Sequence, residues 1–371
     1  PQTITQNNSS GAISHDSRIS NGSNFVITKN FDIFTNPSRL TPYRSFEADQ
    51  TASSADDMKP YYVKDFLYSS TANKLYGLGQ TAGGLTKIVS KASAYDGVWS
   101  LPANSEGDGA VKNGCLVEYK DYLWGFQGTN QVFKWGLLSG TPSITNSVNT
   151  TGVTITSIAQ GLIAKDDNLY LPYNNKLGRV TSGGTYNDAV LTLPTNFKIT
   201  SLANYGNYLA IGCSPISIYN GVSKTFLWNL TSPDVQEVID WGEGELRVQE
   251  TIEGMLIAVI DRFLNNASGA GRGSMIIQGY SGGYPQVLKE VFTAKLNGIV
   301  MPQAKAVKNN RLFFAAKIFT DTTNYNEGIW SFGRKNANYP FALSLDYVYS
   351  GVSTSGIQDF GSAGNYFYLS H

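Results

Sequence analysis

Strand-sized apolar runs recur along the whole chain, and each one opens with the same short pattern. An Asn, Asp or Gly, one variable residue and then Leu or Phe begin each run. The pattern occurs seven times, at intervals of 40 to 56 residues. The seven apolar anchors are Leu75, Leu123, Leu169, Leu209, Leu256, Leu312 and Phe367. Because self-similarity at such a period is typical of repeat architectures, we take this repeat as the basis of the fold.

Each anchor run has strand-like neighbours. An apolar-rich segment precedes it, such as VKDFLY before Leu75, and the link contains Asn, Asp or Gly, which is typical of a tight β-hairpin. A third strand follows, such as QVFKWG after Leu123, and often a fourth. Four short strands in about 40–50 residues are the unit of a β-propeller blade, whereas a sandwich needs no such period and a solenoid repeat is shorter. We therefore predict an all-β protein, a β-propeller of seven blades with four antiparallel strands each.

The seventh repeat is incomplete, because the chain ends at His371 after the second strand of that unit. The segment NFVITKNFDIF, residues 24–34, is strand-like and resembles the outer strands that precede later units. We predict a polar N-terminal arm over residues 1–23 and a propeller over residues 24–371, with N-terminal strands around 24–34 completing blade seven. The competing interpretation is a natural chain that continues beyond His371.

Charge and hydropathy argue against a nucleic-acid partner and against a membrane span. The 371 residues carry 28 basic and 28 acidic side chains, so the formal net charge is zero, and charged residues make up 15% against about 25% in an average globular protein. There is no dense basic run, so we expect no nucleic-acid partner. No run of 18 apolar residues occurs, so we expect no membrane span.

Histidine and cysteine usage narrows the chemistry. The two histidines are His15 in a polar stretch and His371 at the end, so neither a Ser–His–Asp or Cys–His arrangement nor a His-based metal site is expected. We predict no cofactor and no metal. Cys115 and Cys213 are too few for a disulfide framework, and we interpret both as buried free thiols, which fits synthesis in a reducing compartment.

Clustered acids are the remaining candidates for a site. The segment DWGEGE combines Trp241 with Asp240, Glu243 and Glu245, an arrangement that could bind a sugar or a cation. These four are the predicted binding residues, and a plain loop between blades is the alternative. Two further acid pairs, Asp56–Asp57 and Asp166–Asp167, are expected to form turns through their Asx side chains.

The segment TKNFDIFTNPSRLTPYRSFEAD, Thr28–Asp49, carries a resemblance to known proteins. Together with the strand repeats after it, this segment resembles propeller-type, tail-associated virion proteins of tailed bacteriophages. The resemblance implies a structural or adhesive role and supplies no catalytic residues.

From these observations we expect a non-enzymatic virion protein of a tailed phage, tail-associated and present in several copies. It would be synthesised in the host cytoplasm and would bind other virion proteins, with attachment to a host-surface glycan or receptor as a further role. The alternatives are a carbohydrate-binding propeller, a glycosidase that uses two carboxylates about 5–10 Å apart, or an extracellular interaction propeller of cellular origin.

Overall fold

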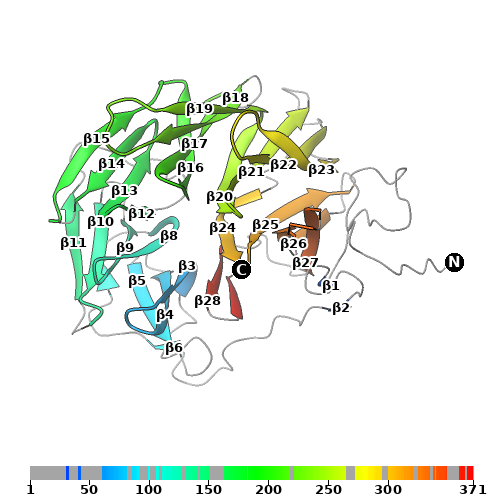
Figure 1. The fold of residues 1–371 in the computed structure, drawn as a ribbon. Helices are drawn as coiled ribbons and strands as arrows, with labels where there is room; N and C mark the ends of the chain where they lie inside the picture. The colour runs from blue at the N-terminus through cyan, green and yellow to red at the C-terminus, as the bar shows by residue number, and fades with distance from the viewer. Residues whose placement is uncertain are drawn as a thin grey trace.

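The computed structural model is all-β in the part of the chain that it describes (Figure 1). The described residues are 31–32, 41–42, 61–81, 86–91, 99–100, 106–107, 111–127, 131–139, 143–149, 163–181, 183–217, 221–264, 272–294, 300–320, 325–334, 337–338, 340–348, 359–363 and 366–370. Within them there is no helix that is long and apolar enough to cross a bilayer.

Six antiparallel sheets follow one another along the chain, and we number them blades 1 to 6. In each sheet the strands pair in chain order, from the first strand to the fourth. Blade 1 contains β3 (Tyr61–Ser69), β4 (Lys74–Thr81), β5 (Thr86–Lys91) and β6 (Trp99–Ser100), with β7 (Glu106–Gly107) also paired to β5. Blade 2 contains β8 (Val111–Tyr119), β9 (Tyr122–Gln127), β10 (Gln131–Gly136) and β11 (Ser143–Asn149). Blade 3 contains β12 (Ile163–Lys165), β13 (Asn168–Tyr173), β14 (Lys176–Val180) and β15 (Tyr186–Thr192).

The second half of the chain repeats this plan. Blade 4 contains β16 (Phe197–Tyr205), β17 (Tyr208–Pro215), β18 (Val222–Trp228) and β19 (Glu237–Glu243). Blade 5 contains β20 (Glu245–Ile252), β21 (Met255–Leu264), β22 (Arg272–Tyr280) and β23 (Gln286–Thr293). Blade 6 contains β24 (Val300–Lys308), β25 (Arg311–Phe319), β26 (Tyr325–Gly333) and β27 (Ala342–Val348). Two shorter sheets pair β1 (Phe31–Asp32) with β2 (Thr41–Pro42), and β28 (Asp359–Ala363) with β29 (Tyr366–Ser370).

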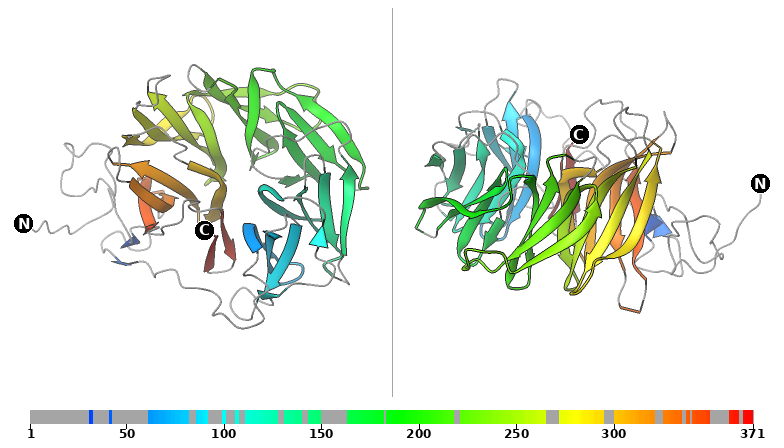
Figure 2. Two further views of the ribbon diagram at one scale, coloured as in Figure 1. Left: turned by 180° about the vertical axis from the view of Figure 1, so that it is seen from behind. Right: turned by 90° about the horizontal axis from the view of Figure 1, so that it is seen from above.

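The blades are arranged in a circle with their first strands innermost (Figures 1 and 2). Each first strand contacts the first strand of the next blade, through β3, β8, β12, β16, β20 and β24. The strand β28 contacts both β24 and β3, so it lies between blade 6 and blade 1. This arrangement confirms the predicted β-propeller. The described residues form six blades of mostly four antiparallel strands where seven were predicted, and the two-stranded sheet β28–β29 lies between the last and the first.

The hairpins between first and second strands follow from the turn residues. Asp166 and Asp167 both have positive φ, 45° and 63°, and so do Asn309 and Asn310, 50° and 56°. Two consecutive positive φ values define the type I′ turn, which favours Asn, Asp and Gly and matches the twist of paired strands. The expectation that Asp166–Asp167 serves as a turn is therefore confirmed.

The anchors of the repeat lie in the second strands and form the core. Each of the six anchors whose side chain is described is at most 1% exposed: Leu75, Leu123, Leu169, Leu209, Leu256 and Leu312. The seventh, Phe367, lies in β29, and its side chain is outside the described part. Five apolar clusters each join two neighbouring blades, from blades 1 and 2 to blades 5 and 6. The repeated Leu positions thus pack blade against blade, as the burial of apolar area requires.

Only a small part of the predicted N-terminal arm and closing strands lies within the described residues. Residues 1–23, the expected polar arm, and most of residues 24–34, the expected closing strands, lie outside the described residues. The described piece, β1, pairs with β2 and contacts β27, the outer strand of blade 6.

Candidate functional site

The four residues predicted from the segment DWGEGE do not meet at one place. Asp240, Trp241 and Glu243 belong to β19, the outer strand of blade 4, and Glu245 begins β20, the inner strand of blade 5. Asp240 and Glu243 are exposed, whereas Trp241 is 2% exposed because successive side chains of a strand point to opposite faces. Asp240 Oδ1 accepts a hydrogen bond from Gly242 N at 3.0 Å, and its Oδ2 lies 3.7 Å from Lys224 Nζ, so its contacts are within blade 4.

Trp241 lies in a buried chain of hydrogen bonds between blades 4 and 5. Its Nε1 donates to Thr225 Oγ1 at 2.8 Å, and Thr225 Oγ1 donates to Gln249 Oε1 at 2.8 Å. Gln249 Nε2 then donates to the carbonyl oxygen of Ala210 at 2.6 Å. Thr225 and Gln249 are both fully buried. The indole ring therefore joins two blades, and its faces are packed inside the protein.

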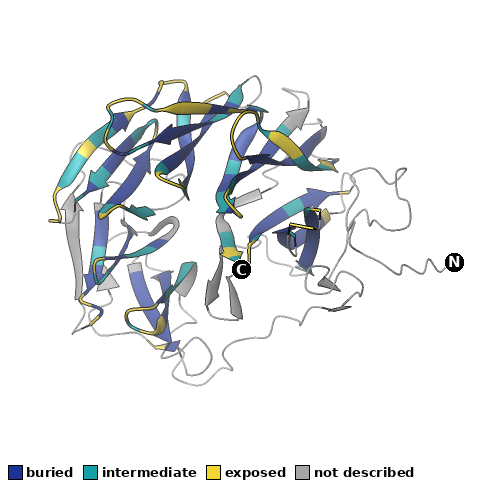
Figure 3. Cartoon of the chain, in the orientation of Figure 1, coloured by how far each residue is buried: buried dark blue, intermediate teal, exposed yellow. Residues whose placement is uncertain are grey.

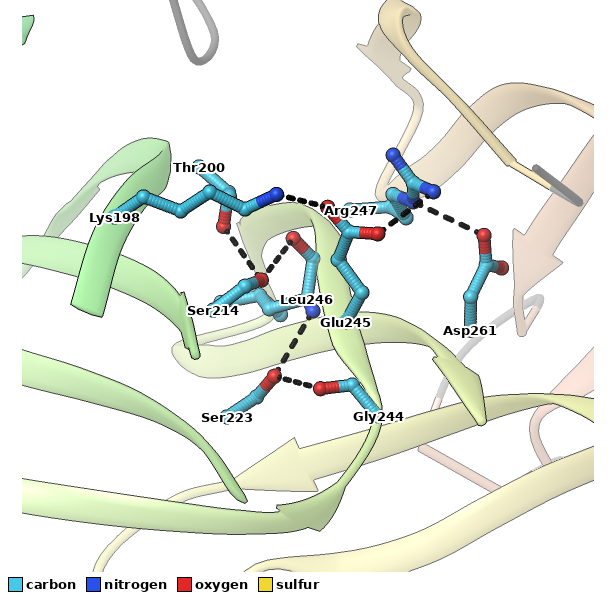
Figure 4. Close-up of polar contacts among 9 residues, drawn as sticks. All are labelled: Lys198, Thr200, Ser214, Ser223, Gly244, Glu245, Leu246, Arg247 and Asp261. Atoms are coloured by element: carbon cyan, nitrogen blue, oxygen red, sulfur yellow. Dashed lines mark hydrogen bonds and ion pairs between the residues drawn. The ribbon is translucent and has the colours of Figure 1, made fainter. Parts of the chain in front are cut away.

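Glu245 is the predicted residue that the structure places in a charged network (Figure 4). Its Oε1 is 2.9 Å from Lys198 Nζ of β16, and its Oε2 is 2.8 Å from Arg247 Nη2. Arg247 Nε is 3.0 Å from Asp261 Oδ2 of β21. We call Lys198, Glu245, Arg247 and Asp261 the rim cluster, because Lys198 and Glu245 lie where the inner strands β16 and β20 begin.

Backbone irregularities next to the rim cluster set its geometry. The pairing of β20 with β21 shifts register between Leu246 and Val248, so Arg247 is the bulged residue. A bulge redirects a side chain out of the regular alternation. Gly244, just before Glu245, has φ of 128°, and an added Cβ would lie 2.6 Å from the carbonyl oxygen of Asp261. Only glycine allows this approach of the two strands.

Hydroxyl groups fix the strand that carries Glu245 and Arg247. Ser223 Oγ donates to Gly244 O at 2.6 Å and accepts from Leu246 N at 3.0 Å. Ser214 Oγ donates to Leu246 O at 3.3 Å and lies 3.2 Å from Thr200 Oγ1. All these hydroxyls come from blade 4, and Thr200 lies where the pairing of β16 with β17 also shifts register. Blade 4 therefore positions the start of the inner strand of blade 5.

In the rim cluster the acidic side chains are buried and the basic side chains are partly exposed. The side chains of Glu245 and Asp261 are 7% and 0% exposed, whereas those of Lys198 and Arg247 are 37% and 21% exposed. Glu245 and Asp261 are directly opposite each other in the β20–β21 pair, and one guanidinium bridges them. Because Asp261 is inaccessible and both acids are ion-paired, this pair holds charges in place. The two carboxylates of a glycosidase must both reach the substrate, and the side chain of Asp261 is fully buried.

Three members of the rim cluster were missed in the sequence. Lys198, Arg247 and Asp261 lie in three different strands. The pairing of β20 with β21 joins Arg247 to Asp261, and the packing of blade 4 on blade 5 adds Lys198. One signal was present: Asp261 follows the apolar run Met255–Ile260 directly, and a carboxylate in such a run needs a partner when buried.

The remaining candidates from the sequence are metal ligands, the two cysteines, the pair Asp56–Asp57 and the two histidines. The structure shows no group of three or more metal-ligating side chains within the described residues. Cys213 is a buried free cysteine, and burial raises the pKa of its thiol, so this part of the cysteine prediction is confirmed. The side chain of Cys115, the pair Asp56–Asp57 and both histidines lie outside the described part.

No protein-family model and no curated protein matches the chain. Among solved structures, the chain is similar to the computationally designed Ika8 protein, with 13% identity, 85% of this chain and 94% of that chain covered, and a TM-score of 0.47. It is also similar to the N-terminal domain of Nup159, with 10% identity, coverages of 83% and 86% and a TM-score of 0.48. BamB from Moraxella catarrhalis gives 11% identity, coverages of 68% and 82% and a TM-score of 0.40. At these values the likeness concerns the fold alone and says nothing of function.

Proposed function

We propose that the chain is a non-enzymatic contact scaffold, a virion component of a tailed phage that is tail-associated and present in several copies. Its ring would have seven blades, with β28–β29 as the inner half of the seventh. Support for the seventh blade comes from β28, which lies between the inner strands β24 and β3. In this proposal, N-terminal strands around residues 24–34 complete that blade, and their described piece, β1, contacts β27 of the neighbouring blade 6.

The observation that carries the scaffold role is apolar exposure on the outer strands of two adjacent blades. Val238 in β19 is 46% exposed, and Val287 and Phe292 in β23 are 60% and 59% exposed (Figure 3). Tyr284, in the turn before β23, is 89% exposed. Outer strands also offer an unpaired backbone edge. Aromatic and aliphatic side chains on an exposed edge are typical of surfaces that bind other proteins.

Two features of the sequence favour a virion as the setting. The segment Thr28–Asp49 resembles tail-associated phage propellers, and zero net charge allows copies to associate without long-range repulsion. Attachment to the host surface would be a second use of the same scaffold.

Mass spectrometry of purified particles tests the setting, and the protein is expected among the virion components. Its absence from every particle preparation would overturn the virion proposal.

The contact surface is tested with F292E, which should reduce incorporation into particles at least tenfold. The matched control is I216E, since Ile216 is 64% exposed but lies in the loop between β17 and β18. Equal incorporation of the two variants would contradict a contact surface on β23.

Carbohydrate binding is the second candidate, and the rim cluster is the observation that favours it. Its partly buried cations, Lys198 and Arg247, are hydrogen-bond donors that are ion-paired with buried acids. Binding of glycans by the purified protein, measured on an array that includes neutral and acidic sugars, would support it. A glycosidase role would in addition require hydrolysis that is lost in E245Q.

A further inference from the structure

The rim cluster has zero net charge, but its two signs lie at different depths. The carboxylates of Glu245 and Asp261 are almost fully buried, and the cationic side chains of Lys198 and Arg247 reach the surface. A ligand that approaches this end of the ring therefore meets an ammonium and a guanidinium group first. The acids lie behind these groups, where they orient them.

Donor capacity remains on both cations. Arg247 uses Nε for Asp261 and Nη2 for Glu245, and no described residue accepts a hydrogen bond from Nη1. Lys198 Nζ contacts one described acceptor, Glu245 Oε1, although an ammonium group has three N–H donors. Both cations contact the same carboxylate, so their positions are coupled across blades 4 and 5.

The support behind the donors is rigid. Arg247 lies at a bulge, and Asp261, fully buried, fixes its Nε. The strand that carries Glu245 is held by Ser223 and Ser214 from blade 4 (Figure 4). Donors that are oriented before binding lose little entropy when a ligand arrives, and a guanidinium presents its N–H groups in a fixed fork that suits a carboxylate.

We propose that the rim cluster binds the carboxylate group of an acidic ligand, with Lys198 and Arg247 as donors and Glu245 and Asp261 as positioning residues. This role is separate from the contact surface on β23, so either can fail alone. The competing interpretation is that the four residues only join blade 4 to blade 5.

The probe is sodium glucuronate, titrated at low salt and followed by calorimetry, with glutamate and glucose as parallel arms. Two charge-assisted contacts should give a Kd of about 1 mM. K198Q should weaken glucuronate binding at least tenfold. The matched control is K120Q, because Lys120 is also an ion-paired lysine and is 45% exposed, but lies in a hairpin at the opposite end of the ring.

E245Q separates binding from a purely structural role. The amide oxygen of the new glutamine can still accept a hydrogen bond and help to position the cations, but the competing internal charge is gone, so glucuronate should bind three- to tenfold more tightly. A structural link predicts lower stability and no gain in binding. Thermal melting of each variant shows which are folded, and the exposed position of Lys198 makes K198Q the decisive variant if E245Q does not fold.

The titrations with glucuronate, glutamate and glucose distinguish the possible ligands. Binding of glucuronate and not glucose supports a carboxylate site on an acidic saccharide, and equal binding of glutamate supports the site but assigns it to acidic side chains. Equal binding of glucose, equal affinity of K198Q and K120Q, or no saturation by either carboxylate would overturn the proposal.

Discussion

Replacing Gln249 by Leu should destabilise the protein strongly, although the two side chains are similar in size. Gln249 is fully buried, accepts from Thr225 Oγ1 and donates to Ala210 O, so Q249L removes two hydrogen bonds between blades 4 and 5. Each lost bond costs about 1 kcal/mol net, and a buried group left unpaired costs about 1–3 kcal/mol. Part of this is regained by the apolar leucine, so we expect a loss of about 2–4 kcal/mol in the free energy of unfolding.

Urea unfolding followed by tryptophan fluorescence measures this loss. The matched control is Q236L, because Gln236 also makes two side-chain hydrogen bonds, to Asn229 N and Asp234 O, but is exposed. Its replacement should change the free energy of unfolding by about 0.5 kcal/mol or less. Combining Q249L with T225V gives a double-mutant cycle, with an expected coupling of about 1 kcal/mol. Equal stability of Q249L and Q236L, or a coupling of zero, would refute the assignment of this chain of bonds as a link between blades.

Three further predictions concern the repeat, the turns and alkaline pH. L256A should lower the free energy of unfolding by about 2–5 kcal/mol, because this anchor is fully buried, whereas V307A, at a 41% exposed position, should change it little in the same urea assay. N309V should cost about 1–2 kcal/mol, because Asn309 has φ of 50°, and N309G should be near neutral. Burial, and secondarily Glu118, raise the pKa of Tyr76 to about 12 from 10. The unfolded chain therefore releases this proton first, and the contribution of Tyr76, complete below pH 10, is lost between pH 10 and 12. Y76F should reduce the drop in melting temperature over that interval, and Y284F, at an 89% exposed position, should not.

The propeller could be predicted from the sequence because its two determinants are local. A buried Leu two residues after an Asn, Asp or Gly marks each second strand, and the turn residues before it have the positive φ that only a few residue types accept readily. Pairs such as Asn309–Asn310 therefore indicate both a hairpin and its register. The closure of the ring depends on contacts between the ends of the chain, and no local pattern determines them.

The candidate site could be predicted only in part, for two physical reasons. Lys198 and Glu245 meet because the inner strands of neighbouring blades lie side by side, a contact that spans 47 positions of sequence. The bulge at Arg247 breaks the alternation of period two, so the pattern alone assigns its side chain to the wrong side. The prediction of Trp241 as a binding residue was wrong for a different reason. Its neighbours in the sequence are acidic, but its own side chain points to the buried face of the strand.

Buried side-chain hydrogen bonds between blades 4 and 5, which we call the polar seam, help to fix how one blade is aligned on the other. Apolar clusters join each pair of consecutive blades, and because they are built from similar Leu, Ile and Phe positions they specify the alignment of one blade on the next only weakly. The bonds from Thr225 to Gln249 and from Ser223 to Leu246 need particular partners at particular heights. A shifted alignment of the two blades would leave these buried groups unpaired. Variants that replace the seam with apolar residues should therefore keep strand content but lose the unique alignment of blade 4 on blade 5. Such a loss would appear as broader unfolding transitions and more association between copies, measured by urea unfolding and light scattering.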